Sequence, residues 1–276
     1  MLLQRVLTAV VLVVVVLAAI FKLPAHGFGL FLLLILSAAI WEWSALAGLK
    51  SVFSRLAYLL LLLFLISLVE FLSPSIAIIM MPGLLFWSMA FYWVLRYPGG
   101  EAAWGQVPVL LLLGVALLLP AWSGFRYLRN QEFYIFHLIF LPGLVASADI
   151  GAYFSGRAFG KHKLAPMVSP NKTWEGVAGG IISCIAVTLL TAALLVSTRV
   201  ALSVPDYLLF GGAALVIAAI SVLGDLFESM VKRFRGVKDS GRLLPGHGGV
   251  LDRIDALTAA IPLYTLMLLQ LETVSS

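Results

Sequence analysis

The sequence predicts an all-α integral membrane protein, a polytopic bundle of about nine transmembrane helices with a cytoplasmic N-terminus. Of the 276 residues, 62% are hydrophobic and only 11% are charged. Soluble domains have an apolar content of roughly 45 to 50%. The apolar residues come in runs of spanning length, and the charged residues gather in the gaps between the runs. We therefore expect a single transmembrane domain over residues 1–276.

The apolar runs define the individual helices. A helix needs about 20 mostly apolar residues, with a range of about 17 to 25, to cross the hydrocarbon core. The candidate spans are 6–21, 28–46, 56–72, 76–95, 107–122, 133–148, 177–196, 208–223 and 254–271. The first run follows Arg5 and resembles a signal peptide, but the stretch 21–24 (Phe-Lys-Leu-Pro) is a poor cleavage site. We expect it to be retained as a helix.

The basic residues fix an orientation, because cytoplasmic loops carry an excess of Lys and Arg. With the N-terminus in the cytoplasm, fourteen of the eighteen basic residues fall on the cytoplasmic side. The other four are Lys22, Arg126, Arg129 and Arg199. We therefore expect the N-terminus inside and the C-terminus outside. The net charge of +5 is spread over helix ends and mixed with acids, which disfavours nucleic acid as a partner.

This topology brings several acids to the cytoplasmic side. Asp149 is expected to end the sixth helix and Asp225 the eighth, whereas Asp252 and Asp255 open the ninth. Three helix ends would then present carboxylates at one depth. Glu42 lies on the same side and could join them.

The segment 149–176 is the first candidate site. It reads as a helix end and a basic loop in which Gly151, Gly156 and Gly160 allow close backbone approach. Backbone amides and cationic side chains both stabilise phosphate oxygens. An ordinary positive-inside loop that meets anionic lipid headgroups is the alternative, but the polar run before the seventh span favours a ligand site. The candidate binding residues are Arg157, Lys161, Ser169, Asn171, Lys172, Thr173 and Glu175.

The second candidate site is a polar stripe that follows the eighth span. On a continuing helix, Asp225, Glu228, Ser229 and Lys232 are spaced i, i+3, i+4 and i+7 and share one face. Acids in or beside a membrane span are costly and indicate function by default. A structural ion pair to Lys232 is the alternative.

The third candidate site is the turn 246–249 (Gly-His-Gly-Gly) with the helix start that follows it. Glycines before a helix let backbone amides face an anion. Asp252 and Asp255 are spaced i and i+3, and a divalent cation such as Mg²⁺ would bridge them to a phosphate. The alternative is two helix-start acids favoured by the helix dipole. His247 is a candidate general acid or base, or a hydrogen-bond donor to phosphate or backbone. Zinc is disfavoured because the sequence lacks a His/Cys cluster.

Residues 229–255 resemble the signature of the phosphatidate cytidylyltransferases, also called CDP-diacylglycerol synthases. The shared pattern is Ser-x-x-Lys-Arg, four residues, Lys-Asp, and then Pro-Gly-His-Gly-Gly and Asp-Arg-x-Asp. The run 169–176 (SPNKTWEG) also looks like the upstream polar motif of this family. The resemblance implies transfer of CMP from CTP to phosphatidate, giving CDP-diacylglycerol and pyrophosphate with Mg²⁺.

With that resemblance in hand, we expect roles for individual residues. Asp225 and Asp252 are expected to bind the metal, with Asp149 and Asp255 as further candidates. The catalytic group would be Asp225, Asp252, Lys232, Lys238, Asp239 and His247. Further substrate-binding residues would be Ser229, Arg233, Gly248, Gly249 and Arg253. We expect in-line attack by a phosphatidate oxygen, because the lipid phosphate is already an oxyanion and requires no nucleophilic side chain.

Two other functions stay open at this point. A CTP-dependent lipid kinase would transfer the γ-phosphoryl group and release CDP, and an anion or lipid transporter would need no nucleotide chemistry. The expected partners are CTP, phosphatidate and the lipid bilayer, with a second copy of the chain as a further candidate. The expected location is the bacterial cytoplasmic (inner) membrane, with the active site, built mainly from 149–176 and 225–255, facing the cytoplasm.

Overall fold

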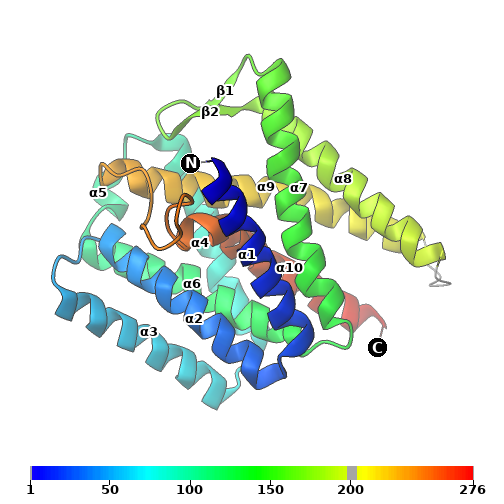
Figure 1. The fold of residues 1–276 in the computed structure, drawn as a ribbon, viewed down its shortest axis with the longest axis horizontal. Coiled ribbons are helices and arrows are strands. Elements are labelled where there is room, and N and C mark those ends of the chain that lie inside the picture. Colours follow the sequence, from blue (N-terminus) through cyan, green and yellow to red (C-terminus); the bar gives the residue numbers. More distant parts are fainter. Residues whose placement is uncertain (1, 198–203, 276) are drawn as a thin grey trace.

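The computed structural model of the chain describes residues 2–197 and 204–275 and is mostly helical (Figure 1). Its elements are α1 (Leu2–Lys22), α2 (Ala25–Leu46), α3 (Val52–Leu72), α4 (Ile76–Arg96), α5 (Glu101–Trp104), α6 (Val107–Arg129), α7 (Tyr134–Phe159), β1 (Lys163–Ala165), β2 (Ser169–Thr173), α8 (Trp174–Ser197), α9 (Val204–Phe234) and α10 (Leu251–Ser275). Within these ranges, nine helices are long and apolar enough to cross a membrane. The predicted all-α polytopic fold is confirmed. Arg199, which the orientation argument counts, lies outside the described residues.

Three helices, α6, α7 and α9, continue at least seven residues further than the apolar pattern predicts, and the last two carry predicted site acids. α7 runs to Phe159 and α9 runs to Phe234. The prediction that Asp149 and Asp225 end their helices is therefore wrong, because both lie inside. An apolar run stops at its first charged residue, but a charged residue does not end a helix. The backbone helix continues here because no proline follows Asp149 or Asp225 within its helix. Asp252, by contrast, lies in the first turn of α10 as expected.

A glycine sets the end of α9. Gly236 has φ +69°, a left-handed conformation that glycine adopts without a steric penalty. The Val237 N–H then reaches back to the Lys232 carbonyl at 3.0 Å, which is the bond of a Schellman cap. The loop that leads to α10 therefore starts directly after the polar stripe.

The glycines of the segment 149–176 serve the close packing of α7 against α8 rather than a loop that binds phosphate. A β-carbon on Gly151 would lie 2.6 Å from the Gly179 carbonyl oxygen and would also meet Ser183 Oγ. A β-carbon on Gly179 would meet Ser155 in the same way. Small residues thus let α7 and α8 approach each other, as is common between membrane helices. The expected loop over Gly151 and Gly156 is wrong, because both lie within α7.

The basic residues after α7 form a hairpin, which apolar patterning alone does not predict. β1 pairs with β2 in antiparallel fashion, with Lys163 opposite Thr173 and Ala165 opposite Ser169. Figure 1 shows the hairpin extending sideways from the end of α7. It carries the polar run of the sequence to the same end of the bundle as the loop 235–250.

α9 lies at the centre of the bundle and packs against an aromatic cluster. The Phe227 ring centroid lies 6.1 Å from that of Trp43 in α2 and 5.1 Å from that of Phe86 in α4. Trp43 Nε1 donates to the Leu110 carbonyl of α6 at 2.8 Å. These contacts immobilise the helix that carries the polar stripe.

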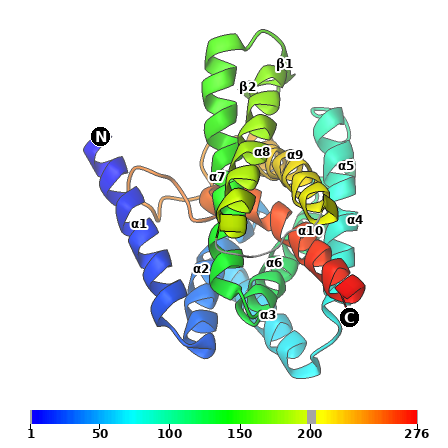
Figure 2. The same ribbon diagram turned by 90° about the vertical axis from the view of Figure 1, so that its right-hand side faces the viewer.

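One end of the bundle, here called the loop end, holds the hairpin and the loop 235–250. Arg235 donates to the carbonyl oxygens of Leu46 at 2.6 Å and Ala47 at 2.5 Å, at the end of α2. Thr8 Oγ1 of α1 donates to the Pro245 carbonyl at 3.0 Å. Figures 1 and 2 show this loop beside the N-terminal half of α1. The loop end is thus built from segments far apart in the sequence.

The opposite end has a polar cluster of its own. Arg126 lies 3.3 Å from Glu70 Oε1 and donates to the Ala25 carbonyl at 3.1 Å. Arg129 donates to the Leu23 carbonyl at 3.0 Å. These contacts connect the turns α1–α2 and α6–α7 and lie away from the loop end.

Candidate active site

The polar stripe predicted on α9 faces the first turns of α10. Lys232 Nζ lies 2.6 Å from Asp252 Oδ1 and 3.4 Å from Glu228 Oε1. Only 9% of the Lys232 side chain is exposed. A lysine buried between two carboxylates in a membrane helix is a functional-site hypothesis by default.

A second lysine–carboxylate pair joins the hairpin to α9. Lys172 of β2 places Nζ 2.8 Å from Asp225 Oδ2 and 3.4 Å from the Val222 carbonyl oxygen. Ser229 Oγ donates to Asp225 Oδ1 at 3.1 Å. The Asp225 side chain is 37% exposed, so this pair is open to a ligand. The segments 149–176 and 225–255 therefore meet at one face, as the sequence predicts.

The glycine turn wraps around Asp252. The Asp252 carboxylate accepts the backbone N–H of Gly249 at 2.8 Å and that of Ser240 at 3.0 Å, besides the Lys232 ammonium. Gly248 has φ +85°, and a β-carbon there would lie 2.8 Å from Asp252 Oδ2. The Gly249 amide does face an anion, as expected, but this anion is the carboxylate of the chain itself.

Three further acids, Glu228, Asp255 and Asp149, lie close to these two pairs. Glu228 is buried, and neither of its carboxylate oxygens has a hydrogen-bond partner. Asp255 places negative charge beside it. Asp149 on α7 is exposed and interacts electrostatically with Lys172 and Asp225. The structure thus brings Asp149 to the same face, although it lies within a helix.

The remaining signature residues lie on the surface of the loop. Lys238, Asp239 and Arg253 are exposed. The His247 backbone N–H donates to the Leu244 carbonyl at 2.9 Å, and its buried Nδ1 has no partner. The role of His247 in proton transfer therefore stays a prediction.

Thr173 and Glu175, both predicted to bind substrate, make contacts that hold the hairpin and the start of α8 in place. Thr173 Oγ1 accepts the Gly176 N–H at 3.1 Å and so caps the start of α8. Glu175 Oε1 lies 2.6 Å from His162 Nδ1 and fastens the hairpin to that helix. The other predicted residues of this segment are exposed or half-buried at the loop end: Arg157, Lys161, Ser169 and Asn171. Their assignment to substrate stays a prediction.

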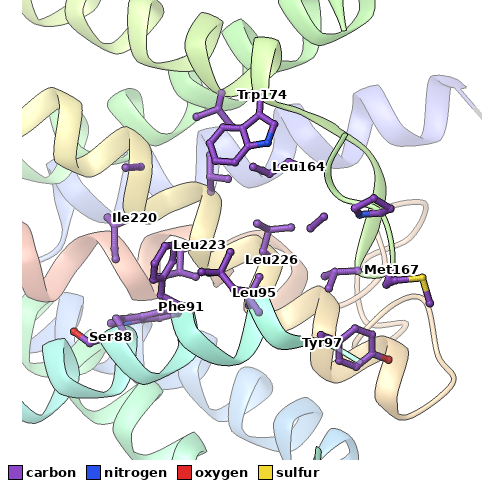
Figure 3. Close-up of a pocket in the computed structure, with 18 of the residues that line it drawn as sticks. Ser88, Phe91, Leu95, Tyr97, Leu164, Met167, Trp174, Ile220, Leu223 and Leu226 are labelled. Atoms are coloured by element: carbon purple, nitrogen blue, oxygen red, sulfur yellow. The ribbon is translucent and has the colours of Figure 1, made fainter. Parts of the chain in front are cut away.

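An apolar groove of about 680 Å³ lies beside the charged cluster. Figure 3 shows its walls, formed by α4, the hairpin, the start of α8 and α9. Val222 and Val168 line the groove, and their carbonyl oxygens accept hydrogen bonds from Lys172 at 3.4 Å and Arg233 at 3.3 Å. The groove and the cationic groups therefore share a wall.

Glu42 also contacts the loop 235–250, and the sequence gives little indication of this contact. Its carboxylate accepts the backbone N–H groups of Val250 at 3.1 Å and Leu251 at 2.8 Å. The only indication in the sequence that Glu42 has a role is that it is an isolated acid near the end of an apolar span. Its partners lie some 200 positions further along the chain, where no local pattern connects them.

The donor set fits a magnesium ion that substrate phosphates complete. Within the ranges that the structure describes, no three His, Cys, Asp or Glu side chains are grouped to hold a metal ion. Mg²⁺, however, is usually bound through one or two carboxylates plus substrate phosphates. Asp225 offers an accessible carboxylate, and the Glu228 oxygens, which accept no hydrogen bond, are hard donors of the kind that Mg²⁺ prefers. Asp252 is already engaged by Lys232 and two amides.

Comparison with known proteins gives full-length matches. The profile of the cytidylyltransferase family matches residues 3–271. The phosphatidate cytidylyltransferase of Pseudomonas aeruginosa is 44% identical over 268 residues, covering 97% of each chain. That of Haemophilus influenzae is 41% identical over 285 residues, covering 96% of this chain and 98% of the relative. That of Brucella suis is 39% identical over 94% of this chain and 90% of the relative.

Proposed function

The chain belongs to the cytidylyltransferase family, and we propose that it transfers CMP from CTP to phosphatidate, giving CDP-diacylglycerol and pyrophosphate. Curated relatives that match nearly the whole chain have the name of this activity. The observation that carries the proposal is the presence of two lysine–carboxylate pairs, Lys172–Asp225 and Lys232–Asp252, on one face, with the first pair beside an apolar groove. A water-soluble triphosphate and a membrane lipid can both reach such a site.

The reaction needs positioning and charge neutralisation more than a nucleophilic side chain. A phosphatidate oxygen attacks the α-phosphorus of CTP, a new P–O bond forms, and the bond to the β-phosphate oxygen breaks to release pyrophosphate. Both substrates are anionic, so cations must offset their repulsion. Lys172, Lys232 and Arg233 supply this positive charge. Arg233 is exposed, and Lys172 is more accessible to a phosphate than the buried Lys232.

When bound, Mg²⁺ would neutralise charge on the CTP phosphates and help to align them. Asp225 would hold it, with Asp252, Asp149 and Asp255 as further candidates. Asp252 would have to exchange one of its hydrogen bonds to Lys232 or the loop amides for the metal. The all-oxygen donor set supports this assignment. Activity should be lost on chelation with EDTA and return on addition of Mg²⁺.

The apolar groove would receive an acyl chain of phosphatidate. Its lining is almost wholly apolar, and one wall is shared with Lys172 and Arg233. A lipid whose chain lies in the groove would therefore present its phosphate to cations. An acyl chain that enters from the bilayer gains no hydrophobic free energy, because lipid tails are as apolar as the groove lining. The groove would therefore select phosphatidate by shape and by holding its phosphate beside the cations.

The site would face the cytoplasm of a bacterial inner membrane. The nine apolar helices within the described residues indicate an integral membrane protein, the relatives are bacterial, and the basic residues favour a cytoplasmic N-terminus. A second copy of the chain stays a candidate partner, which chemical cross-linking in native membranes would test.

Incubation of the purified protein with CTP, Mg²⁺ and phosphatidate tests the proposal. CDP-diacylglycerol and pyrophosphate are expected in equal amounts. Release of CDP with a phosphorylated lipid alcohol would instead support a lipid kinase. Counterflow of a labelled anion in liposomes, without consumption of CTP, would support a transporter.

A further inference from the structure

Glu42 of α2 binds the loop that carries the signature residues. The residue is 2% exposed. Its Oε1 accepts the Val250 N–H at 3.1 Å, and its Oε2 accepts the Leu251 N–H at 2.8 Å and the Ser240 hydroxyl at 3.0 Å. A carboxylate from one helix thus caps the start of another, α10, where backbone N–H groups have no partner within the helix.

Glycines of the loop enclose this carboxylate. A β-carbon on Gly241 would meet Glu42 Oε1, and a β-carbon on Gly249 would meet Glu42 Oε2 and Ser240 Oγ. The loop backbone therefore lies directly against the Glu42 carboxylate, and neither position has room for a side chain without displacing it.

The Glu42 and Asp252 carboxylates share the same stretch of loop. Ser240 donates its backbone N–H to Asp252 and its hydroxyl to Glu42. At the other side, the Gly249 N–H goes to Asp252, and the next two N–H groups go to Glu42. A shift of the loop away from Glu42 would therefore also shift two of the donors that orient Asp252.

The end of α2 also holds the start of this loop. Arg235, directly after α9, donates to the carbonyl oxygens of Leu46 and Ala47. Both ends of the loop 235–250 are thus fixed to the last two turns of one helix.

We propose that Glu42 is a positioning residue for the cytidylyl transfer: by holding residues 240–251 it keeps Asp252 and Lys232 in the arrangement that the reaction requires. The inference rests on the proposed function, and Glu42 itself need not touch a substrate. Gln cannot replace it, because both oxygens accept backbone N–H groups and an amide has only one acceptor oxygen.

The test compares wild type with Glu42→Gln, Gly241→Ala and Glu70→Gln. Glu70 is the matched control, an acid of an apolar helix with side-chain partners at the opposite end. We expect Glu42→Gln to lower kcat by about 10- to 100-fold, the range typical of residues that orient a site from behind, with smaller changes in both KM values. Gly241→Ala should act in the same direction without removing a charge, and Glu70→Gln should retain the wild-type kcat.

Amide hydrogen exchange of the substrate-free protein in detergent gives a readout independent of activity. The amides of Val250 and Leu251 should exchange faster in Glu42→Gln and in Gly241→Ala than in wild type and Glu70→Gln. If Glu42→Gln does not fold, Gly241→Ala decides.

Several outcomes would overturn the inference: wild-type kcat in either loop variant, unchanged exchange at Val250 and Leu251, or an equal loss of kcat in Glu70→Gln. A wild-type protein that makes no CDP-diacylglycerol would contradict the proposed function instead, and the exchange data would still decide whether Glu42 holds the loop.

Discussion

Two lysines determine the charge balance of the proposed site. Lys232 is buried between Glu228 and Asp252, whereas Lys172 lies against the partly exposed Asp225. An ammonium group is more strongly attracted to a phosphate in low-dielectric surroundings than in water.

The polar stripe could be predicted from its spacing, but the pairing of each lysine could not, because Lys172 meets Asp225 across 53 positions of sequence.

Asp252→Asn is expected to lower kcat by about 100-fold or more, the loss typical of removing one group that stabilises transition-state charge. Asn has a single acceptor oxygen, so it cannot hold Lys232 and both loop amides together. Turnover of labelled CTP is measured over a range of Mg²⁺ concentrations, with the exposed Glu132→Gln as control. Full turnover with unchanged Mg²⁺ dependence would remove Asp252 from the site.

At the level of elements, apolar runs predicted the number of spans but misplaced the ends of α6, α7 and α9. α7 and α9 extend past Asp149 and Asp225 because a charged residue does not end a helix, and α9 stops only at the glycine cap of Gly236. The hairpin and α5 were not predicted, because each is only a few residues long and has no periodic pattern. The start of α10 was predicted, since glycines followed by acids form a local signal.

The contact of α7 with α8 should be sensitive to added volume. We expect Gly151→Ala to destabilise the protein by about 1–3 kcal/mol, the usual cost of overpacking, because the new β-carbon would lie against the Gly179 backbone. Gly143→Ala on the same helix is the matched control, with no atom within 4 Å of its new β-carbon. The apparent Tm in detergent is the measurement. Equal Tm values for both variants would argue against close packing at this contact.

The groove between α4 and α9 should select for chain length. Ala219→Phe places a ring in the groove and should raise KM for long-chain phosphatidate more than for a short-chain analogue. Leu215→Phe is the control on the same helix, because Leu215 is exposed and does not line the groove. Both variants are assayed with both lipids in mixed micelles. Similar KM ratios for the two variants would contradict acyl binding in the groove.

For the whole molecule, the two ends of the bundle differ in chemistry. The loop end collects the carboxylates, the lysines and the hairpin, whereas the opposite end has Arg126 and Arg129 bound to turn carbonyls and Glu70. The alternation of basic and nearly uncharged gaps in the sequence predicted this separation, because successive spans place successive gaps at opposite ends. The depth of each acid was harder to predict, since it depends on how far each helix continues beyond its apolar run.

Cysteine labelling tests which end faces the cytoplasm. Lys163→Cys marks the hairpin at the loop end, and Glu132→Cys marks the opposite end, each in a Cys184→Ser background. In spheroplasts, a membrane-impermeant maleimide should label position 132 directly and position 163 only after permeabilisation, because the excess of basic residues places the loop end inside. The reverse pattern would invert the topology. It would also contradict the proposed reaction, since the groove and both lysine–carboxylate pairs would then lie on the side of the membrane where CTP is absent.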